Sequence, residues 1–274
     1  MSSEGYVLGN APHELRRLIL QDRMILRPIT ARLLRQAGLK EGMRVLDIGC
    51  GTGGVSLLAA EMVGSSGAVV GIDQSPDAIA MATKRARESG LHQSVFSMCS
   101  AEAFSSTEPF DVVIGRYVLM YQPSPAAFIR AASQHARAGG VIAFHEISLH
   151  RGYHSLPSYP AWELMAKCLN LGFRVGAPSW DAAGRLVEHF RNAGLAHPHL
   201  FAEVPIGGGE GTPIYGWLAE TVRSLMPTLL ENGGVTEEEI SIDTLEGRMR
   251  SGAVELQAQV DAPPQVCAWV RISS

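Results

Sequence analysis

Apolar and polar positions along the chain follow two patterns, one typical of buried strands and one typical of helices. Between residues 43 and 147, short apolar runs are separated by longer segments with apolar residues three or four positions apart. The runs predict strands at 43–49, 68–73, 93–100, 110–116 and 141–147. The segments between them predict helices at 54–64, 75–90 and 124–140, the last one ended by a glycine pair. Strands that alternate with helices of this length predict a parallel sheet with helices on both faces.

The segments that flank this core are predicted to be mostly helical. Residues 13–38 fit two helices that are interrupted near Pro28 and end at Gly38. Further helices are expected at 159–172, 180–195, 212–233 and 236–252, a strand within 197–209, and a last strand at 265–272, placed most simply at one edge of the sheet. We therefore expect one domain with four parts: an N-terminal helical cap (1–40), a core (41–150), a helical insertion or lid (151–197) and a segment that completes the sheet (198–274).

Composition limits the partners that the protein is expected to have. The 274 residues carry a net charge of −4 and no basic run, which argues against binding along a nucleic-acid backbone. No apolar stretch approaches the roughly 18 residues of a membrane helix. The start of the chain lacks a basic segment followed by an apolar one, so no secretory signal is expected. Four scattered cysteines without C-x-x-C spacing indicate reduced thiols, and we expect a cytoplasmic protein.

The stretch "VLDIGCGTGG", residues 45–54, carries the strongest chemical signal. Gly49, Gly51 and Gly54 satisfy the dinucleotide pattern G-x-G-x-x-G, and Asp73 follows at the spacing of a ribose-binding acid. A carboxylate at Asp47 would repel a pyrophosphate, by several kcal/mol at ~4 Å in partly shielded surroundings. The same carboxylate suits a ligand such as S-adenosylmethionine, which carries an ammonium and a sulfonium but no phosphate. The residues alone favour that ligand and leave a nicotinamide dinucleotide as the alternative.

Four segments in this order resemble the motifs of class I S-adenosylmethionine-dependent methyltransferases. They are "VLDIGCGTGG", "VVGIDQSPDAI", "SAEAF" and the stretch from "FDVVIGRYVLMY" to "GGVIAFHE", and together they cover roughly residues 40–150. The N-terminal "YVLGN…ELRRLILQ" and the helical region after residue 155 are similar to a bacterial small-molecule subgroup of that family. The resemblance implies a doubly wound, Rossmann-like, mostly parallel sheet of seven strands.

The resemblance also implies which residues bind S-adenosylmethionine. Asp47, directly or through water, and Gly49, Cys50 and Gly51 would meet the positive end of the ligand. Asp73 with Gln74 would meet the ribose, and Ala101 with Glu102 the adenine. Arg116 could bind the methionine carboxylate or an anionic substrate, or else form an ion pair with Glu102 or Asp47. Tyr121 could line the pocket, and Tyr6 and Gln21 could cover the cofactor if the N-terminal helices form a lid. Ser100 departs from the aspartate that is common in the family, which weakens an expected adenine contact.

His145 and Glu146 are the candidate catalytic residues, because they end the fifth predicted strand near the expected methyl position. Either could accept a substrate proton or position a hydroxyl or amine. The alternative is a hydrogen-bonded residue that shapes the pocket wall. The neighbouring histidines in "HEISLHRGYH" do not have the spacing H-E-x-x-H, so no metal site is predicted.

The expected function is in-line methyl transfer from S-adenosylmethionine to a small metabolite, with O-, N- and C-methylation left open. Two alternatives remain: a protein of this fold that catalyses cyclisation or has another non-methylating role, and a nicotinamide-dependent dehydrogenase. The expected partner is a small-molecule methyl acceptor, without nucleic acid or membrane, and a homo-oligomer is possible.

Overall fold

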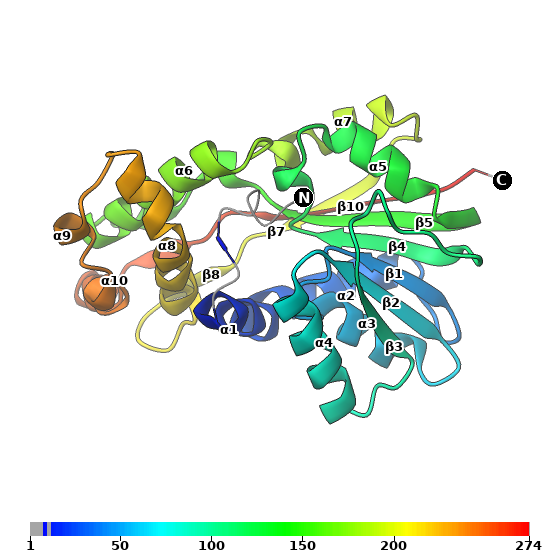
Figure 1. Cartoon of the computed structure of the whole chain (residues 1–274). Helices are drawn as coiled ribbons and strands as arrows, with labels where there is room; N and C mark the ends of the chain where they lie inside the picture. Colours follow the sequence, from blue (N-terminus) through cyan, green and yellow to red (C-terminus); the bar gives the residue numbers. More distant parts are fainter. Residues whose placement is uncertain (1–7, 10–11, 274) are drawn as a thin grey trace.

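A seven-stranded sheet forms the centre of the computed structural model, which describes residues 8, 9 and 12–273 (Figure 1). Its strands are β1 Arg44–Ile48, β2 Ala68–Asp73, β3 Ser94–Met98, β4 Phe110–Arg116, β5 Ala136–Ile147, β7 His199–Glu203 and β10 Gln265–Arg271. The strand order is β3-β2-β1-β4-β5-β10-β7. The pairs from β3 to β5 are parallel, and β10 is antiparallel to both of its neighbours. The expected mostly parallel sheet of seven strands is confirmed.

The position of β10 corrects one prediction. Residues 265–271 do not form an edge: they lie between β5 and β7, and β7 is the edge strand. The reason lies in the burial of both faces of β10, where Cys267, Ala268 and Val270 are all buried. A strand that is apolar on both faces gains more from an interior position than from an edge.

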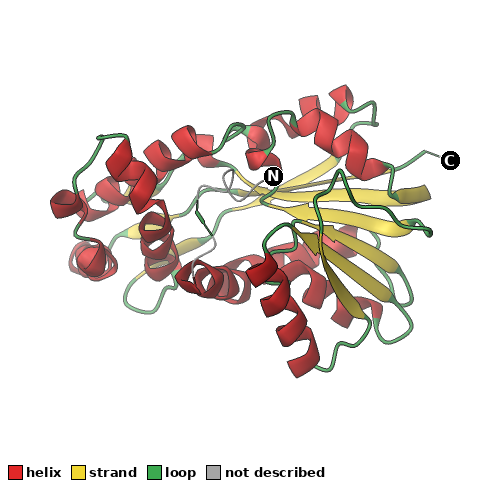
Figure 2. Cartoon of the chain, viewed as in Figure 1, coloured by secondary structure: helices red, strands yellow, loops and turns green. Residues whose placement is uncertain are grey.

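Helices cover both faces of the sheet (Figure 2). Helices α2 Arg27–Gln36 and α3 Gly54–Val63 share a core with Val45, Ile114 and Ala143. Helices α5 Pro125–Ser133 and α7 Leu186–Asn192 share a core with the intervening strand residues, such as Leu46 and Phe144. Helix α4 Pro76–Glu88 packs on β2 and β3. Alternating side chains of each strand therefore pack into two apolar layers, one on each face of the sheet.

Capping signals predict the start of α4 but not the end of α5. Ser75 caps α4 by accepting from the Ala78 backbone N–H, with Pro76 in the first turn. Helix α5, in contrast, ends at Ser133 and not at the glycine pair Gly139–Gly140. Residues from Ala136 onward already belong to β5, because Ala136 pairs with Phe110 of β4 across a local irregularity in the ladder.

The N-terminal helices are continuous and not broken at Pro28. Helix α1 Pro12–Gln21 passes through a π-helical segment, Asp22–Leu26, into α2. Pro28 lies in the first turn of α2, directly after this wider turn. A π segment inserts an extra residue into a helix and often marks a functional site.

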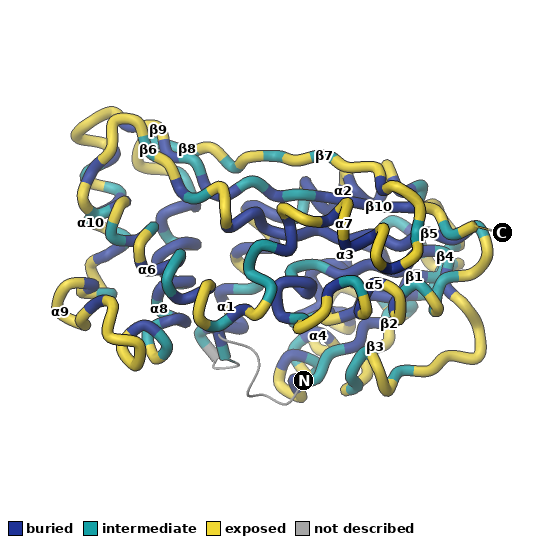
Figure 3. Tube along the Cα trace, turned by 90° about the horizontal axis from the view of Figure 1, so that it is seen from above, coloured by how far each residue is buried: buried dark blue, intermediate teal, exposed yellow. Residues whose placement is uncertain are grey.

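A second core lies beside the carboxyl ends of the parallel strands. It is built by helices α6 Pro160–Gly176, α8 Ile214–Glu231, α9 Glu237–Ile240 and α10 Ile242–Leu256 and by a small sheet of β6 His154–Leu156, β9 Gln259–Asp261 and β8 Ile206–Gly208. Trp162 and Tyr215 are among its fully buried side chains. The central strands and the inner faces of these helices are buried, whereas α9 is largely exposed (Figure 3). The small sheet was not predicted, because its strands are only three residues long.

Candidate functional site

A cavity opens where the carboxyl ends of the strands meet α1 and α8. Its lining includes the glycine loop, the end of β2, the segment after β4, and residues of the two helices. The side chains and backbone that the argument below uses are Gly49, Cys50, Gly51, Asp73, Gln74, Ala101, Arg116, Tyr117, Tyr121, Arg17, Gln21 and Trp217. This is the edge where doubly wound sheets bind their ligands.

The glycine loop is held to the end of β2 by its own backbone. Gly49 and Gly51 have φ values of +70° and +52°, in the left-handed region that favours glycine. A Cβ on Gly49 would lie 2.6 Å from Val118 Cγ1, so this position has no room for a side chain. The N–H groups of Gly49 and Cys50 both donate to the Ile72 carbonyl. Three consecutive residues therefore present a bare, rigid backbone to the cavity.

Asp73 closes this arrangement with both carboxylate oxygens. Oδ2 accepts from the Gly51 N–H at 2.8 Å, and Oδ1 accepts from the Ser75 N–H at 2.9 Å. Each oxygen keeps a free lone pair, because a carboxylate offers about four acceptor sites. Asp73 lines the cavity beside Gln74, where its remaining lone pairs can accept hydrogen bonds from a ligand.

Asp47 does not line the cavity. It is 1% exposed, and its Oδ2 accepts from the Ser56 hydroxyl of α3 at 2.5 Å. Strand alternation explains this position, because Asp47 points to the same face as Val45, towards α3. Burial raises its pKa to about 6, against the opposing effects of Ser56 and Arg116. The expectation that Asp47 meets the ligand directly is not met by this geometry, in which Asp47 is hydrogen-bonded to Ser56 of α3.

His145 and Glu146 also point away from the cavity, to opposite faces of β5. His145 is fully buried on the α2 side, with Nδ1 2.9 Å from the Thr30 hydroxyl and Nε2 3.3 Å from Gln265 Oε1. Burial and the nearby Arg116 lower its pKa to about 3, so the ring is neutral. The role that this position supports is the alternative stated above, a hydrogen-bonded support of the wall.

Glu146 holds the turn that follows β4. Its Oε1 accepts from the N–H groups of Val118 and Leu119, both at 3.0 Å, while Oε2 has no partner in the described part of the chain. Burial raises the pKa of this carboxyl to about 8, although the backbone donors oppose the shift. Glu146 therefore shapes the segment 117–121, which lines the cavity, without lining it itself.

Arg116 does line the cavity, but its charge is already paired. Its Nη1 lies 2.8 Å from Asp22 Oδ1, in the π segment, and donates to Thr30 at 3.1 Å. The predicted alternatives for an ion pair, Glu102 and Asp47, are therefore wrong as the partner. Asp22 was missed because the π segment that turns it inward has no signature in the sequence.

The remaining predicted residues divide between the wall and the surface. Cys50, Ala101 and the buried Tyr121 line the cavity, whereas Glu102 is exposed and does not. Tyr6 lies outside the described residues. Tyr117, which follows Arg116, lines the cavity with a φ of +58° and donates its hydroxyl to Gln265.

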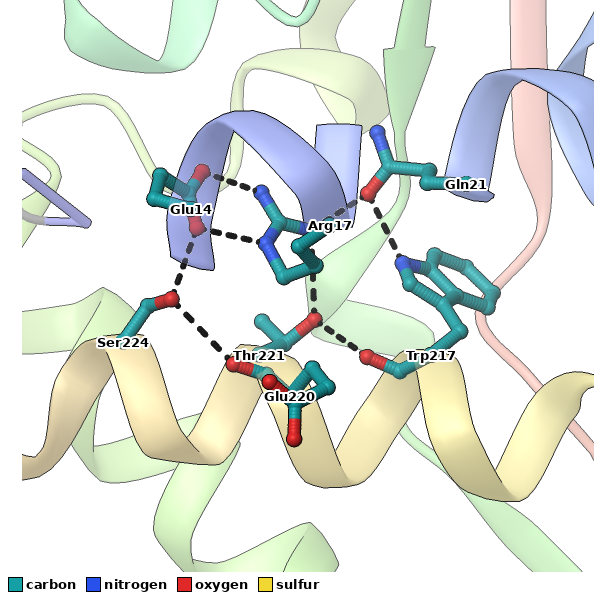
Figure 4. Close-up of polar contacts among 7 residues, drawn as sticks. All are labelled: Glu14, Arg17, Gln21, Trp217, Glu220, Thr221 and Ser224. Carbon is teal, nitrogen blue, oxygen red and sulfur yellow. Dashed lines mark hydrogen bonds and ion pairs between the residues drawn. The ribbon is translucent and has the colours of Figure 1, made fainter. Parts of the chain in front are cut away.

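Two helices contribute polar residues that sequence reasoning largely missed. Arg17 and Gln21 of α1 and Trp217 and Thr221 of α8 line the cavity and are joined by hydrogen bonds (Figure 4). The available signal was their spacing of four residues within each helix, which puts both members on one face. Nothing in the sequence indicated that these two faces would meet.

Neither a metal site nor a membrane span emerges from the described residues. No group of three or more potential metal-ligating side chains comes together among them. None of the described helices combines the length and the hydropathy that crossing a bilayer needs.

Comparisons with known proteins identify the family to which the chain belongs. A family model described as a methyltransferase domain matches residues 39–189. The aklanonic acid methyltransferase DauC of Streptomyces sp. (strain C5) is 38% identical over 118 residues, which are 43% of this chain and 54% of that protein. The ubiquinone biosynthesis O-methyltransferase of Azoarcus sp. (strain BH72) is 38% identical over 109 residues, 39% of this chain and 45% of that protein. The chain thus spans about half the length of these relatives.

A solved structure extends the likeness of fold to most of the chain. A protein of Bacillus halodurans C-125, described as a candidate methyltransferase, superposes with a TM-score of 0.58 at 20% identity. The match covers 89% of this chain and 99% of that one. The family match spans more than half of the chain, from the residues just before β1 into α7. This chain therefore belongs to the methyltransferase-domain family, among the class I S-adenosylmethionine-dependent methyltransferases.

Proposed function

We propose that this protein transfers the methyl group of S-adenosylmethionine to a small, largely apolar acceptor. The observation that carries the proposal is the two-sided cavity. One side has the bare glycine loop and the Asp73 carboxylate, and the other has apolar and aromatic side chains such as Tyr153, Phe173 and Trp217. Ligand sites of this kind combine an apolar lining with a few placed polar groups. The relatives named as an aklanonic acid methyltransferase and as a ubiquinone biosynthesis O-methyltransferase support an acceptor of this character.

The backbone of the loop supports this cofactor better than a dinucleotide. The N–H groups of Gly49, Cys50 and Gly51 all donate within the protein, to Ile72 and Asp73. A pyrophosphate needs free N–H donors at such a turn, and it would also face the Asp73 carboxylate. This argument replaces the one from Asp47, which does not line the cavity.

The chain contributes binding, orientation and exclusion of water. S-adenosylmethionine, when bound, supplies an electrophilic methyl carbon on a sulfonium. Asp73 would accept from its ribose hydroxyls, and Gly49 and Gly51 would let the methionine portion approach the backbone. Holding the acceptor in line with the methyl carbon can lower the barrier by roughly 7–11 kcal/mol. We assign no base to His145 or Glu146, because both are buried away from the cavity.

Labelled S-adenosylmethionine tests the proposal directly. The protein is incubated with methyl-labelled cofactor and a panel of phenols, hydroxyquinones and amines, and label that leaves the cofactor is measured. Transfer to at least one acceptor is the expected result. Tight binding of S-adenosylhomocysteine without any transfer would favour the cyclisation alternative, and binding of NADH in its place would favour the dehydrogenase.

A cytoplasmic location, the absence of a nucleic-acid partner and a homo-oligomeric state stay predictions. Free thiols at all four cysteines agree with a reducing compartment.

A further inference from the structure

Helices α1 and α8 are joined by a buried polar cluster, here called the α1–α8 seam (Figure 4). It consists of Glu14, Arg17 and Gln21 of α1 and Trp217, Thr221 and Ser224 of α8. Arg17 donates to both oxygens of Glu14 at 2.6 Å and to Thr221 at 3.3 Å. The Ser224 hydroxyl donates to Glu14 at 2.7 Å. The seam therefore ties the two helices that cover the cavity.

The seam fixes which way the Gln21 amide faces. Its Oε1 accepts from Arg17 Nη1 at 2.5 Å and from Trp217 Nε1 at 2.8 Å. The reversed amide would set an –NH2 group against two donors, so the assignment of oxygen and nitrogen is unambiguous. The Nε2 atom consequently points away from the seam, and it donates to no residue in the described part of the chain (Figure 4). Gln21 lines the cavity with two unused N–H donors.

Neighbours on α1 and in the π segment place Gln21 over the glycine loop. Leu18 Cδ1 lies 3.9 Å from the position that a Cβ on Gly51 would take. The Asp22 carboxyl carbon lies 2.7 Å from the corresponding position of Gly54. Gln21 lies between these two residues in the sequence and lines the same cavity as the glycine loop, where the methionine portion of the cofactor is expected.

The nearby cations are already neutralised by buried carboxylates. Arg17 pairs with Glu14 at 2.6 Å, and Arg116 pairs with Asp22 at 2.8 Å. An anion bound to either guanidinium would have to share it with a carboxylate that already balances its charge. The Gln21 amide, in contrast, offers donors that need no rearrangement.

We infer that the Gln21 amide binds the α-carboxylate of the methionine portion, a role that rests on the proposed function. The seam positions the Gln21 amide, because Arg17 and Trp217 both donate to its oxygen. This assignment takes the place of the carboxylate contact that was considered for Arg116.

Calorimetry with two ligands isolates the carboxylate. S-adenosylhomocysteine and its decarboxylated analogue differ only in the group that Gln21 is inferred to bind. Gln21→Met should weaken the binding of S-adenosylhomocysteine about 10- to 100-fold, the range of a hydrogen bond to a charged group. The same variant should bind the decarboxylated analogue within about twofold of the unaltered protein.

A second variant distinguishes loss of the carboxylate contact from misfolding. Gln21→Glu keeps an acceptor for Arg17 and Trp217 but replaces the amide donors by a negative oxygen. Gln21→Glu should lower the affinity for S-adenosylhomocysteine at least as much as Gln21→Met does. It should bind the decarboxylated analogue no more weakly than the unaltered protein does. Ser224→Ala is the matched control: it alters the seam outside the cavity lining and should leave the ratio of the two affinities unchanged.

The inference is overturned if either Gln21 variant binds both ligands more weakly by the same factor, or binds both as tightly as the unaltered protein does. An effect confined to the KM of the acceptor would also overturn it and would assign the amide to the acceptor. Failure of the unaltered protein to bind S-adenosylhomocysteine is a distinct result, because it would refute the proposed function itself.

Discussion

At the scale of single residues, Asp73 has two tasks. Its oxygens accept from the backbone of Gly51 and Ser75, and the same oxygens face the cavity. The glycine loop and the expected ribose contact therefore depend on one side chain. An amide in this place could accept on one side only and would offer a donor to an N–H group on the other.

Replacement of Asp73 by asparagine is expected to weaken S-adenosylhomocysteine binding about 10- to 100-fold, because charge-assisted hydrogen bonds are worth roughly 1.5–3 kcal/mol each. Titration calorimetry measures the effect. Asp77→Asn, at an exposed position in the first turn of α4, is the matched control and should bind normally. Unchanged affinity in Asp73→Asn would remove the ribose role.

Glu146 should make stability depend on pH. Its folded-state pKa of about 8 lies above the ordinary value of 4.5, because the carboxyl is buried. The folded protein keeps a proton that the unfolded chain releases between these values. The contribution of Glu146 to the free energy of unfolding therefore falls as the pH rises from about 4.5 to about 8.

The variant Glu146→Gln lacks this titration, so its Tm should rise relative to that of the unaltered protein between pH 5 and pH 8. The expected size is roughly 2–4 °C for each kcal/mol, followed by circular dichroism. Glu102→Gln, at an exposed position, should show no such trend. A difference in Tm that is constant over this pH range would contradict the account.

The residue types of the site were easier to predict than their directions. The glycine spacing and the position of Asp73 are typical of a nucleoside site, and the loop glycines and Asp73 do line the cavity. Asp47 and His145 were assigned to the cavity because they end strands, but the period of two along β1 and β5 turns both towards the helical layer. The signal was present in the sequence, since Val45 and Ala143 share their faces.

Among the elements, the π segment Asp22–Leu26 connects the N-terminal helices to the site. It turns Asp22 inward, where the carboxylate is 1% exposed and pairs with Arg116. A regular helix through these residues would change the direction of every side chain after it. The segment thus carries information that hydrophobic spacing alone does not contain.

Removal of one partner of this ion pair should be costly. Asp22→Asn leaves Arg116 without its buried counter-ion, and we expect the free energy of unfolding to fall by about 3 kcal/mol in urea titrations. The double variant Asp22→Asn with Arg116→Met should recover part of the loss, because it no longer buries a lone charge. Glu188→Gln, in the exposed pair with Arg185, should leave stability unchanged. An unchanged free energy of unfolding in Asp22→Asn would show that the ion pair is not needed for the fold.

Elements with regular spacing were predicted well, and the irregular ones were not. The five strands of the core and the capped helix α4 agree with the prediction. The glycine pair was assigned to the end of a helix, whereas pairing with β4 draws it into β5. Long-range pairing of this kind overrides a local stop signal, because the ladder supplies hydrogen bonds to residues that the helix would leave unpaired.

For the whole molecule, the cavity is shared by segments that are far apart in the sequence. Residues of α1, of the core and of α8 all line it. A ligand bound there contacts the layers of the main sheet and the second core, and it should therefore stabilise the chain as one unit.

S-adenosylhomocysteine at about 100 times its Kd should add roughly 2.7 kcal/mol to the free energy of unfolding and raise Tm by about 5–10 °C. A thermal-shift assay measures this change, with NADH at the same concentration as the control that should give none. A larger shift with NADH would reverse the choice of cofactor.

The interior position of β10 has a consequence for biosynthesis. Residues 265–271 separate β5 from β7, so the edge of β5 stays open and β7 has no partner strand until these residues have left the ribosome. A nascent chain stalled before Gln265 therefore exposes unpaired strand edges, and we expect it to bind chaperones and to be prone to aggregation.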